Sequence, residues 1–295
     1  MPTARSIAGR TVFITGGARG VGAEVARRLH ARGANLVLTD LDAAPLAELR
    51  DRLGPQRVHT ALADVRELTD MQAAADAAAE RFGGIDVVMA NAGIASYGSV
   101  LQVDPQAFRT LMDVNVLGVF HTVRATLPSV LQRRGYVLVV SSLAAYAASP
   151  GLAPYHASKA AVEHFANALR LEVGYRGVDV GTAHMSWIDT PLVRDARADL
   201  PTFTEMVSKL PFPLNRTTSV EACGKAFVAG IERRKRRINC PGWVGAMRWL
   251  KPLLSTPLGE TPVVKLVPEL LPRMDAEVAA LGRSMGTRTA DLEER

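Results

Sequence analysis

The sequence predicts an α/β fold, a doubly wound parallel sheet in a single domain, and three observations support this class. From Arg10 onward, short β-branched runs alternate with longer segments of helical periodicity, which is typical of a parallel sheet covered by helices. The runs are nearly continuously apolar, as expected of strands buried on both faces. The chain's 295 residues, 48% of them hydrophobic and 22% charged, are enough to enclose one large core. This composition excludes a disordered tail, a collagen and a coiled coil.

Seven apolar runs are the expected strands of the sheet. They are predicted at residues 11–15, 35–39, 58–62, 85–90, 136–141, 178–184 and, weakly, near Ile238. Three capping patterns predict helix starts between them: Thr69 with Gln72, Asp104 with Pro105, and Thr218 with Glu221.

Two later segments depart from this alternation. Residues 191–216 hold four prolines and mixed polarity, which predicts a mobile flap. Residues 242–295 lie beyond the last expected strand and form a C-terminal extension to a domain of residues 1–241. In the extension, Met274, Val278 and Leu281 have helical spacing, and the polar tail after Gly282 is expected to be loose.

Cysteine content and the N-terminus predict a cytoplasmic protein. Cys223 and Cys240 are the only cysteines, too few for a disulfide framework. Residues 1–10 carry two arginines but no apolar stretch resembling a signal peptide. Serines, prolines and a glycine interrupt the longest uncharged stretch, 135–158, so we interpret it as a strand, a loop and a helix start instead of a membrane span.

The net charge of +6 is concentrated in one segment. Residues 231–251 contain seven basic residues and one acidic residue, so they account for the whole net charge. The rest of the chain is balanced, which argues against a protein that binds nucleic acid. Apolar residues between Trp243 and Leu254 alternate with Arg248 and Lys251. This pattern is compatible with a peripheral membrane contact, a subunit contact or a lid over a pocket.

The first expected strand runs into a glycine-rich turn with the spacing TGxxxGxG. Gly16 permits the tight turn, Gly20 lets the main chain approach a pyrophosphate, and Gly22 lets the next helix pack closely on the strand. Val21 and Val25 begin the helical spacing. A strand, a glycine turn and a helix N-terminus together predict a phosphate cradle for a dinucleotide.

Two charged residues bear on which dinucleotide binds. Asp40 ends the second strand about 20 residues after the glycines, where a carboxylate accepts hydrogen bonds from an adenosine ribose and repels a 2′-phosphate. This favours NAD. Arg19, inside the glycine turn, argues for NADP because a guanidinium pairs with a 2′-phosphate, unless it is simply solvated or pairs with Asp40.

Further motifs follow in order along the chain. Asn91-Ala92-Gly93 comes after the fourth strand, Asn115 lies in a helix, Ser142 closes the fifth strand, and Tyr155 and Lys159 open the next helix. With the glycine turn, these motifs resemble the short-chain dehydrogenase/reductase family over about residues 10–240, with the spacing of its short-form members. The resemblance implies a Rossmann-like fold and an oxidoreductase that uses NAD or NADP.

Ser142, Tyr155 and Lys159, here called the Tyr155 group, are the candidate catalytic residues. Tyr155 and Lys159 stand four residues apart on a helix and so share a face, where the ammonium is expected to lower the phenol's pKa from about 10. A tyrosine tuned in this way is a general acid and base. Ser142 is placed to donate a hydrogen bond to the substrate oxygen. The resemblance adds that Asn115 supports a water chain leading to Lys159.

The resemblance also implies contacts to the cofactor outside the glycine turn. It assigns adenine contacts to Asp64 and Val65, the wall behind the adenosine ribose to Asn91, Ala92 and Gly93, and nicotinamide carboxamide contacts to Ile188 and Thr190. The sequence departs from the family where Met185-Ser186 replaces the usual Pro-Gly, so that turn must take backbone angles open to serine.

The candidate substrate residues carry no fixed charge. They are Ser96, Tyr97, Leu143, Tyr146, Trp187 and Leu192. A pocket of this kind favours an uncharged and bulky secondary alcohol or ketone, such as a steroid, terpenoid or lipid-derived carbonyl, over a small hydroxy acid. No metal site is predicted.

The sequence therefore predicts an NAD-dependent alcohol dehydrogenase or carbonyl reductase that forms a homodimer or homotetramer. Two alternatives stay open. One is an NADPH-dependent carbonyl reductase, if Arg19 outweighs Asp40. The other is a nucleotide-binding, membrane-associated protein that has lost turnover, for which the Met185-Ser186 departure and the basic extension are the support.

Overall fold

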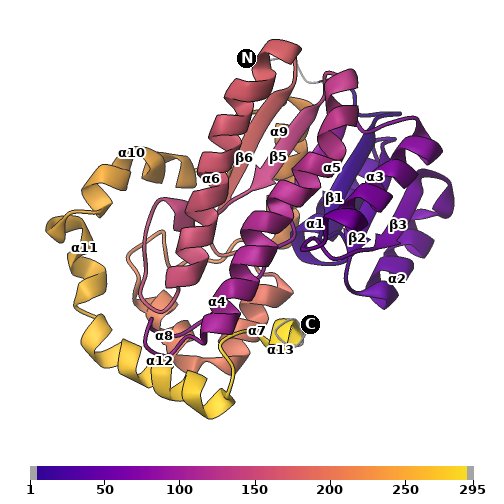
Figure 1. Cartoon of the computed structure of the whole chain (residues 1–295). Helices are drawn as coiled ribbons and strands as arrows, with labels where there is room; N and C mark the ends of the chain where they lie inside the picture. Colours follow the sequence, from indigo (N-terminus) through magenta and orange to yellow (C-terminus); the bar gives the residue numbers. More distant parts are fainter. Residues whose placement is uncertain (1–4, 291–295) are drawn as a thin grey trace.

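The computed structural model describes residues 5–290 and contains one seven-stranded parallel sheet with helices on both faces (Figure 1). The strand order is β3-β2-β1-β4-β5-β6-β7. The strands are β1 (Thr11–Thr15), β2 (Asn35–Asp40), β3 (Val58–Leu62), β4 (Val87–Ala90), β5 (Tyr136–Val140), β6 (Asp179–Met185) and β7 (Arg237–Cys240). The predicted fold class is confirmed, and each predicted strand is present within two residues of its expected bounds.

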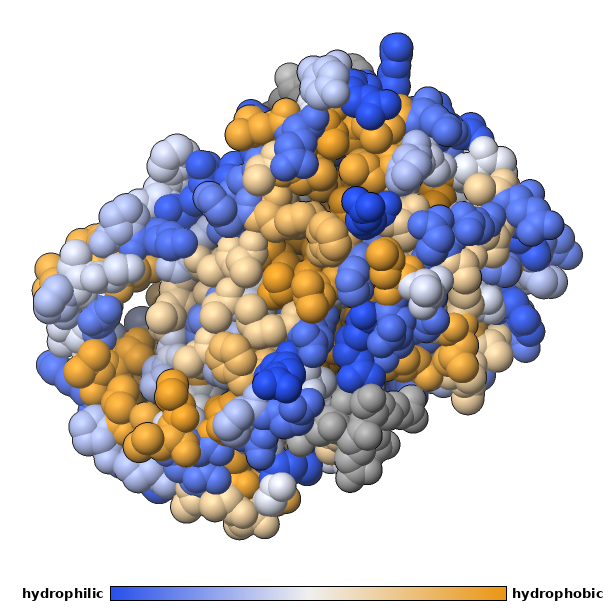
Figure 2. Space-filling model, in the orientation of Figure 1, coloured by the Kyte–Doolittle hydropathy of each residue, from blue (hydrophilic) through white to orange (hydrophobic). Residues whose placement is uncertain are grey.

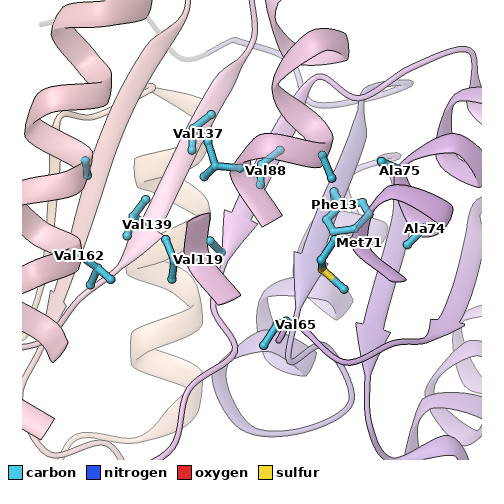
Figure 3. Packing of buried hydrophobic residues seen from close by; sticks show 14 of the residues in the cluster. Phe13, Val65, Met71, Ala74, Ala75, Val88, Val119, Val137, Val139 and Val162 are labelled. Atoms are coloured by element: carbon cyan, nitrogen blue, oxygen red, sulfur yellow. The ribbon is translucent and has the colours of Figure 1, made fainter. Parts of the chain in front are cut away.

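The sheet alternates its side chains between two apolar layers, as the pleat requires. On one face, Phe13 of β1 and Val137 of β5 pack against α3 (Leu68–Phe82), α5 (Gly118–Gln132) and α6 (Ala153–Val173), as Figure 3 shows. On the other face, Ile14 and Leu138 pack against α1 (Gly20–His30), α2 (Ala43–Leu53) and α9 (Val220–Glu232). Burial on both faces explains why the strand sequences are apolar throughout.

One of the three predicted helix starts is confirmed. The Asp104 carboxylate accepts a hydrogen bond from the Gln106 backbone N–H at 2.6 Å and caps α4 (Pro105–Met112). The other two predictions are wrong by one or two residues: α3 begins before Thr69, and Ser219 caps α9 in place of Thr218. Thr218 instead forms a β-bridge with Ile188: its N–H donates to the Trp187 carbonyl, and its carbonyl accepts from the Asp189 N–H.

The segment predicted as a mobile flap, 191–216, forms two helices in the structure. These are α7 (Pro191–Asp199) and α8 (Pro201–Lys209). Both begin with a proline at the first helical position, which explains how a proline-rich segment is helical. Phe203 and Met206 of α8 pack on Met274 of α12 (Val267–Leu281) in a third apolar cluster.

The C-terminal extension is an arch of helices that leaves β7 and returns to α8 (Figure 1). It comprises α10 (Val244–Leu254), α11 (Pro257–Val264), α12 and α13 (Thr287–Ala290), and apolar residues gather on it (Figure 2). The prediction of a loose tail after Gly282 is wrong for residues 283–290. Ser284 and Met285 are buried, and the Ser284 carbonyl accepts a hydrogen bond from Tyr97 N–H at 2.7 Å.

The continuous helical segment Pro105–Gln132 is long and apolar enough to cross a membrane by length and composition. Half of it is buried, and it packs against α3 and α6 in the layer shown in Figure 3. We therefore interpret it as a core helix.

Candidate functional site

The glycine turn lies where β1 meets the N-terminus of α1. Gly16 and Gly20 have φ angles of +63° and +53°, which only glycine adopts readily. A Cβ on Gly22 would lie 2.1 Å from the Gly16 carbonyl oxygen, so this position also requires glycine. Within residues 5–290 no side chain caps the start of α1, and its first N–H groups are therefore placed to bind an anion.

Asn91 fixes the shape of this turn from the neighbouring strand. Its Nδ2 donates hydrogen bonds to the carbonyl oxygens of Thr15 (2.9 Å) and Gly16 (3.1 Å). The Thr15 hydroxyl accepts in return from the N–H groups of Asn91 (3.0 Å) and Ala92 (3.1 Å). The structure thus brings Asn91 and Ala92 to the glycine turn, with Asn91 acting as its support.

Asp40 lies beside the same turn at the end of β2. Its Oδ2 accepts a hydrogen bond from Ala18 N–H at 2.9 Å, and its Oδ1 accepts from Leu41 N–H at 2.9 Å. Burial raises the pKa of this carboxyl, and the backbone hydrogen bonds oppose that rise. Arg19 does not pair with Asp40; its Nη2 lies 3.2 Å from Asp42 in an exposed ion pair.

The predicted adenine contacts, Asp64 and Val65, follow β3. The Asp64 carboxylate accepts hydrogen bonds from the Arg66 backbone N–H at 2.9 Å and the Arg66 Nη2 at 2.7 Å, so it stabilises its own turn. Val65 is buried against Gly118 of α5. The Asp64 N–H also donates to the Asp70 carboxylate at 2.9 Å, and the Val65 carbonyl lies 3.1 Å from His121 Nδ1, so both residues hold the loop after β3 in place.

Ser142, Tyr155 and Lys159 meet at the carboxyl end of β5. The Ser142 Oγ accepts a hydrogen bond from Ala144 N–H at 3.1 Å, and its hydrogen bonding to Tyr155 lowers the pKa of that phenol. Lys159 lies one helical turn after Tyr155 on α6, with its Nζ 5.6 Å from the centre of the tyrosine ring. The same Nζ donates to the Val140 carbonyl at 3.2 Å.

Burial controls the protonation of this group. It raises the pKa of Tyr155 above its ordinary value, with the Ser142 hydrogen bond acting in the opposite direction. It also lowers the pKa of Lys159 from 10.5 to about 8. The predicted direction for Tyr155 is therefore corrected: desolvation of the phenol outweighs its neighbours.

Asn115 lies in a π-helical turn, Asp113–Leu117, between α4 and α5. Its buried amide accepts from Ile94 N–H (2.8 Å) and donates to the Ile94 carbonyl and the Ser158 Oγ (both 3.0 Å). A Cβ on Gly93 would lie 3.1 Å from Asn115 Oδ1 and 3.3 Å from Lys159 Nζ. Glycine at this position therefore leaves open the space between the amide and the ammonium.

Residues 185–190 connect β6 back to the glycine turn. A Cβ on Gly20 would lie 3.4 Å from the Thr190 methyl group, so Thr190 reaches the cofactor cradle. Ile188 is buried and bridges Thr218. The Met185-Ser186 departure is accommodated because β6 continues through Met185 and Ser186 N–H donates to the Cys240 carbonyl at 3.0 Å.

The structure separates the candidate substrate residues into two groups. Tyr97, Trp187 and Leu192 join the third apolar cluster, against which Tyr155 also packs. The Phe203 ring, which the sequence analysis missed, lies 5.6 Å from the Tyr97 ring and 5.4 Å from the Trp187 ring. This aromatic cluster is the apolar surface next to the tyrosine.

The remaining candidates lie elsewhere. Leu143 and Tyr146 pack with Val244 of α10 in a fourth cluster, and no contact places them with Tyr97 in the described residues. Ser96 is buried beside the C-terminal segment through its bridge to Met285, and its Oγ has no hydrogen-bond partner among residues 5–290. Leu143 and Tyr146 contact α10 because the short helix after Ser142 turns toward the extension.

The sequence analysis also missed His184, which is fully buried in β6. Its Nδ1 lies 3.2 Å from the Ser142 carbonyl, and its Nε2 lies 2.9 Å from the Tyr146 hydroxyl. Burial lowers the pKa of His184 to about 4, so the ring is neutral at physiological pH. Its signal in the sequence is a titratable residue inside an otherwise apolar strand. Among residues 5–290 no three His, Cys, Asp or Glu side chains are grouped to hold a metal.

Comparisons with known proteins agree with this geometry. Residues 10–201 match the family model described as short chain dehydrogenase. An uncharacterized NAD-dependent oxidoreductase of Mycobacterium tuberculosis is 33% identical, over 68% of this chain and 78% of its own. The 11-beta-hydroxysteroid dehydrogenase 1A of Arabidopsis thaliana is 31% identical, over 80% of this chain and 69% of its own. A short chain dehydrogenase from Mycobacterium paratuberculosis bound to NAD superposes with a TM-score of 0.70 at 28% identity, covering 79% of this chain and 97% of that one.

Proposed function

Because the chain belongs to the short-chain dehydrogenase/reductase family and is an oxidoreductase, we propose that it uses NAD to interconvert an apolar secondary alcohol and its ketone. One observation carries the proposal: Ser142, Tyr155 and Lys159 meet between the glycine turn and an aromatic cluster. The residues for proton transfer thus lie next to the residues for cofactor binding.

The residues of the glycine turn fit a dinucleotide. The positive φ angles and the missing Cβ atoms leave bare backbone at the N-terminus of α1, where a pyrophosphate would be held by N–H groups. Asp40 would accept the hydroxyls of the adenosine ribose. NAD, when bound, supplies the acceptor or donor of hydride.

The chain's own residues handle the substrate oxygen and its proton. Tyr155 gives its hydroxyl proton to the ketone oxygen in reduction, and in oxidation its phenolate takes the proton from the alcohol. The raised pKa of Tyr155 keeps the phenol protonated at neutral pH, ready to act as the acid. The Ser142 hydroxyl orients the same oxygen, and Lys159 stabilises the phenolate after proton transfer. Asn115 and Lys159 flank the space beside Gly93, which would hold a water that returns the proton.

Two features support an apolar substrate. The cluster beside Tyr155 includes the aromatic rings of Tyr97, Trp187 and Phe203. The Arabidopsis relative is named as a hydroxysteroid dehydrogenase, and a hydroxysteroid is a bulky apolar alcohol. A panel of apolar secondary alcohols, a hydroxysteroid among them, should therefore be oxidised with a higher kcat/KM than short hydroxy acids. Equal rates for the two classes would contradict this part of the proposal.

The choice between NAD and NADP has a specific test. Asp40→Ala should weaken NADH binding and raise the NADPH to NADH ratio of kcat/KM by about tenfold or more, because it removes the carboxylate that repels a 2′-phosphate. Asp42→Ala is the matched control, since it frees Arg19 and leaves Asp40 in place. If Asp42→Ala shifts the ratio and Asp40→Ala does not, Arg19 is the selector and the NADPH-dependent alternative is favoured.

A further inference from the structure

A second cavity lies between α6, β7 and α10, apart from the Tyr155 group. Its volume is about 320 Å³ and it is open to solvent. Its polar lining comprises Tyr146, Glu163, His164, Asn167, Arg237, Arg248 and Lys251. The core domain and the C-terminal extension both contribute, because Arg248 and Lys251 belong to α10.

The lining carries more positive than negative charge. Three cations face the cavity, but Glu163 is the only carboxylate that lines it, and its Oε1 is 4.0 Å from Arg237 Nη2. The same Oε1 accepts a hydrogen bond from the Tyr146 hydroxyl at 3.1 Å. Among residues 5–290, neither Arg248 nor Lys251 forms an ion pair of its own. The cavity therefore has two uncompensated positive charges.

Helix α10 presents these two cations to the cavity. At 100° per residue, Arg248 and Lys251 lie on the same face as Val244, which is fully buried against the core. Lys251 reaches back far enough to donate to the Ala145 carbonyl at 3.0 Å. The Arg248 guanidinium also lies 4.7 Å from the centre of the Trp249 ring, which is 76% exposed. Arg248 is half-buried and Lys251 is exposed, so both cations are accessible from solvent and an anion can reach them through the open side of the cavity.

A buried donor in the cavity also lacks an acceptor. Arg237 Nε is buried and has no hydrogen-bond partner among the described residues. An unpaired buried donor costs about 1–3 kcal/mol. Burial lowers the pKa of the nearby Arg170, and the charges of Arg236, Arg237 and Arg248 act in the same direction.

We propose that this cavity is an oxyanion site that holds a phosphate group by Arg237, Arg248 and Lys251. Its volume is about ten times the roughly 30 Å³ that a water occupies in the liquid, so it accepts a phosphate together with part of the molecule that carries it. Arginine guanidinium groups match phosphate oxygens in two-point hydrogen bonding. Because the ligands come from β7 and α10, a bound phosphate would fasten the extension to the core domain.

The test uses the full chain and inorganic phosphate, titrated by calorimetry and thermal unfolding at constant ionic strength with NaCl as the balance. Phosphate should raise the Tm of the wild type, and Arg248→Gln should weaken its binding by about tenfold or more through loss of a charged hydrogen bond. The control is Arg233→Gln, which removes an exposed cation from the same basic segment outside the cavity. An unchanged Tm for Arg248→Gln in NaCl shows that this variant folds.

A second arm separates free phosphate from a lipid headgroup. Vesicles containing phosphatidic acid are floated with the wild type, Arg248→Gln and Arg233→Gln. The site is supported if Arg248→Gln weakens the binding of either probe and Arg233→Gln does not. The probe that binds more tightly identifies the source of the phosphate. The proposal is overturned if neither probe binds beyond the NaCl control, or if Arg248→Gln binds as well as the wild type. None of these readouts depends on turnover, so they are independent of the proposed function.

Discussion

Replacing Lys159 by methionine is expected to stabilise the folded protein near neutral pH while abolishing turnover. Burial lowers the pKa of Lys159 from 10.5 to about 8. Below pH 8 the lysine is charged in both states, and this difference of about 2.5 units destabilises the fold by about 3 kcal/mol at 1.36 kcal/mol per unit. Methionine removes the charge and keeps an unbranched chain, at the loss of about 1 kcal/mol for the hydrogen bond to Val140. The net gain at pH 7 is about 2 kcal/mol.

The sign of the pH dependence is the sharper part of this prediction. Between about pH 8 and 10.5 the unfolded chain binds more protons at this site than the folded one, so wild-type stability rises with pH. From pH 7 to about 9.5 the rise from this one group is about 2 kcal/mol. Lys159→Met should lack it. Both proteins contain Tyr155, so any contribution from its titration cancels in the comparison.

The assay is urea unfolding of both proteins at several values of pH from 7 to about 9.5. Lys225→Met, on the exposed side of α9, controls for the loss of a lysine at the surface. Plotted against pH, the free energies of unfolding of wild type and Lys159→Met should converge as the pH rises. Parallel curves, or a Lys159→Met protein that is less stable at pH 7, would refute the argument that burial of the ammonium destabilises the site.

Three further changes have expected outcomes. Gly22→Ala should weaken NADH binding by about a hundredfold in a fluorescence titration, because its Cβ would push the Gly16 carbonyl out of place; unchanged affinity would show that the turn adjusts freely. Asn115→Ala should lower the free energy of unfolding by about 2–4 kcal/mol in urea, since it leaves both backbone groups of Ile94 unpaired; a loss under 1 kcal/mol would contradict this. Tyr136→Phe should lower it by only about 1 kcal/mol through the lost bond to Lys235, without a change in KM.

The sheet could be predicted from the sequence because its strands are buried on both faces. Short, continuous apolar runs such as those of β1 and β5 are typical of strands buried on both faces. The ends of the predicted strands therefore agree with the structure to within two residues. Helix starts were less secure. The capping-box pattern at Thr69 lies inside α3, whose N-cap position is Glu67, two residues earlier. Capping motifs are local, and tertiary contacts outweigh them.

Long-range packing explains what the sequence could not predict. The tail after Gly282 is polar, yet Ser284 and Met285 are buried because Tyr97 and Ser96 offer backbone partners far away in the chain. The spacing of Tyr155 and Lys159 predicted that they share a face, but not that burial would raise the pKa of the tyrosine. Desolvation depends on the whole surrounding structure and has no signature in a four-residue spacing.

The most direct test of the central claim compares wild type and Tyr155→Phe. Phenylalanine keeps the ring in its cluster and removes only the hydroxyl that transfers the proton. We expect both proteins to bind NADH with similar affinity, and the wild type alone to oxidise apolar secondary alcohols with NAD, with kcat reduced by about 10²-fold or more in the variant. Turnover by Tyr155→Phe at the wild-type rate would contradict the assignment of Tyr155 as the acid and base. Failure of the wild-type protein to bind NADH would contradict the proposed function itself.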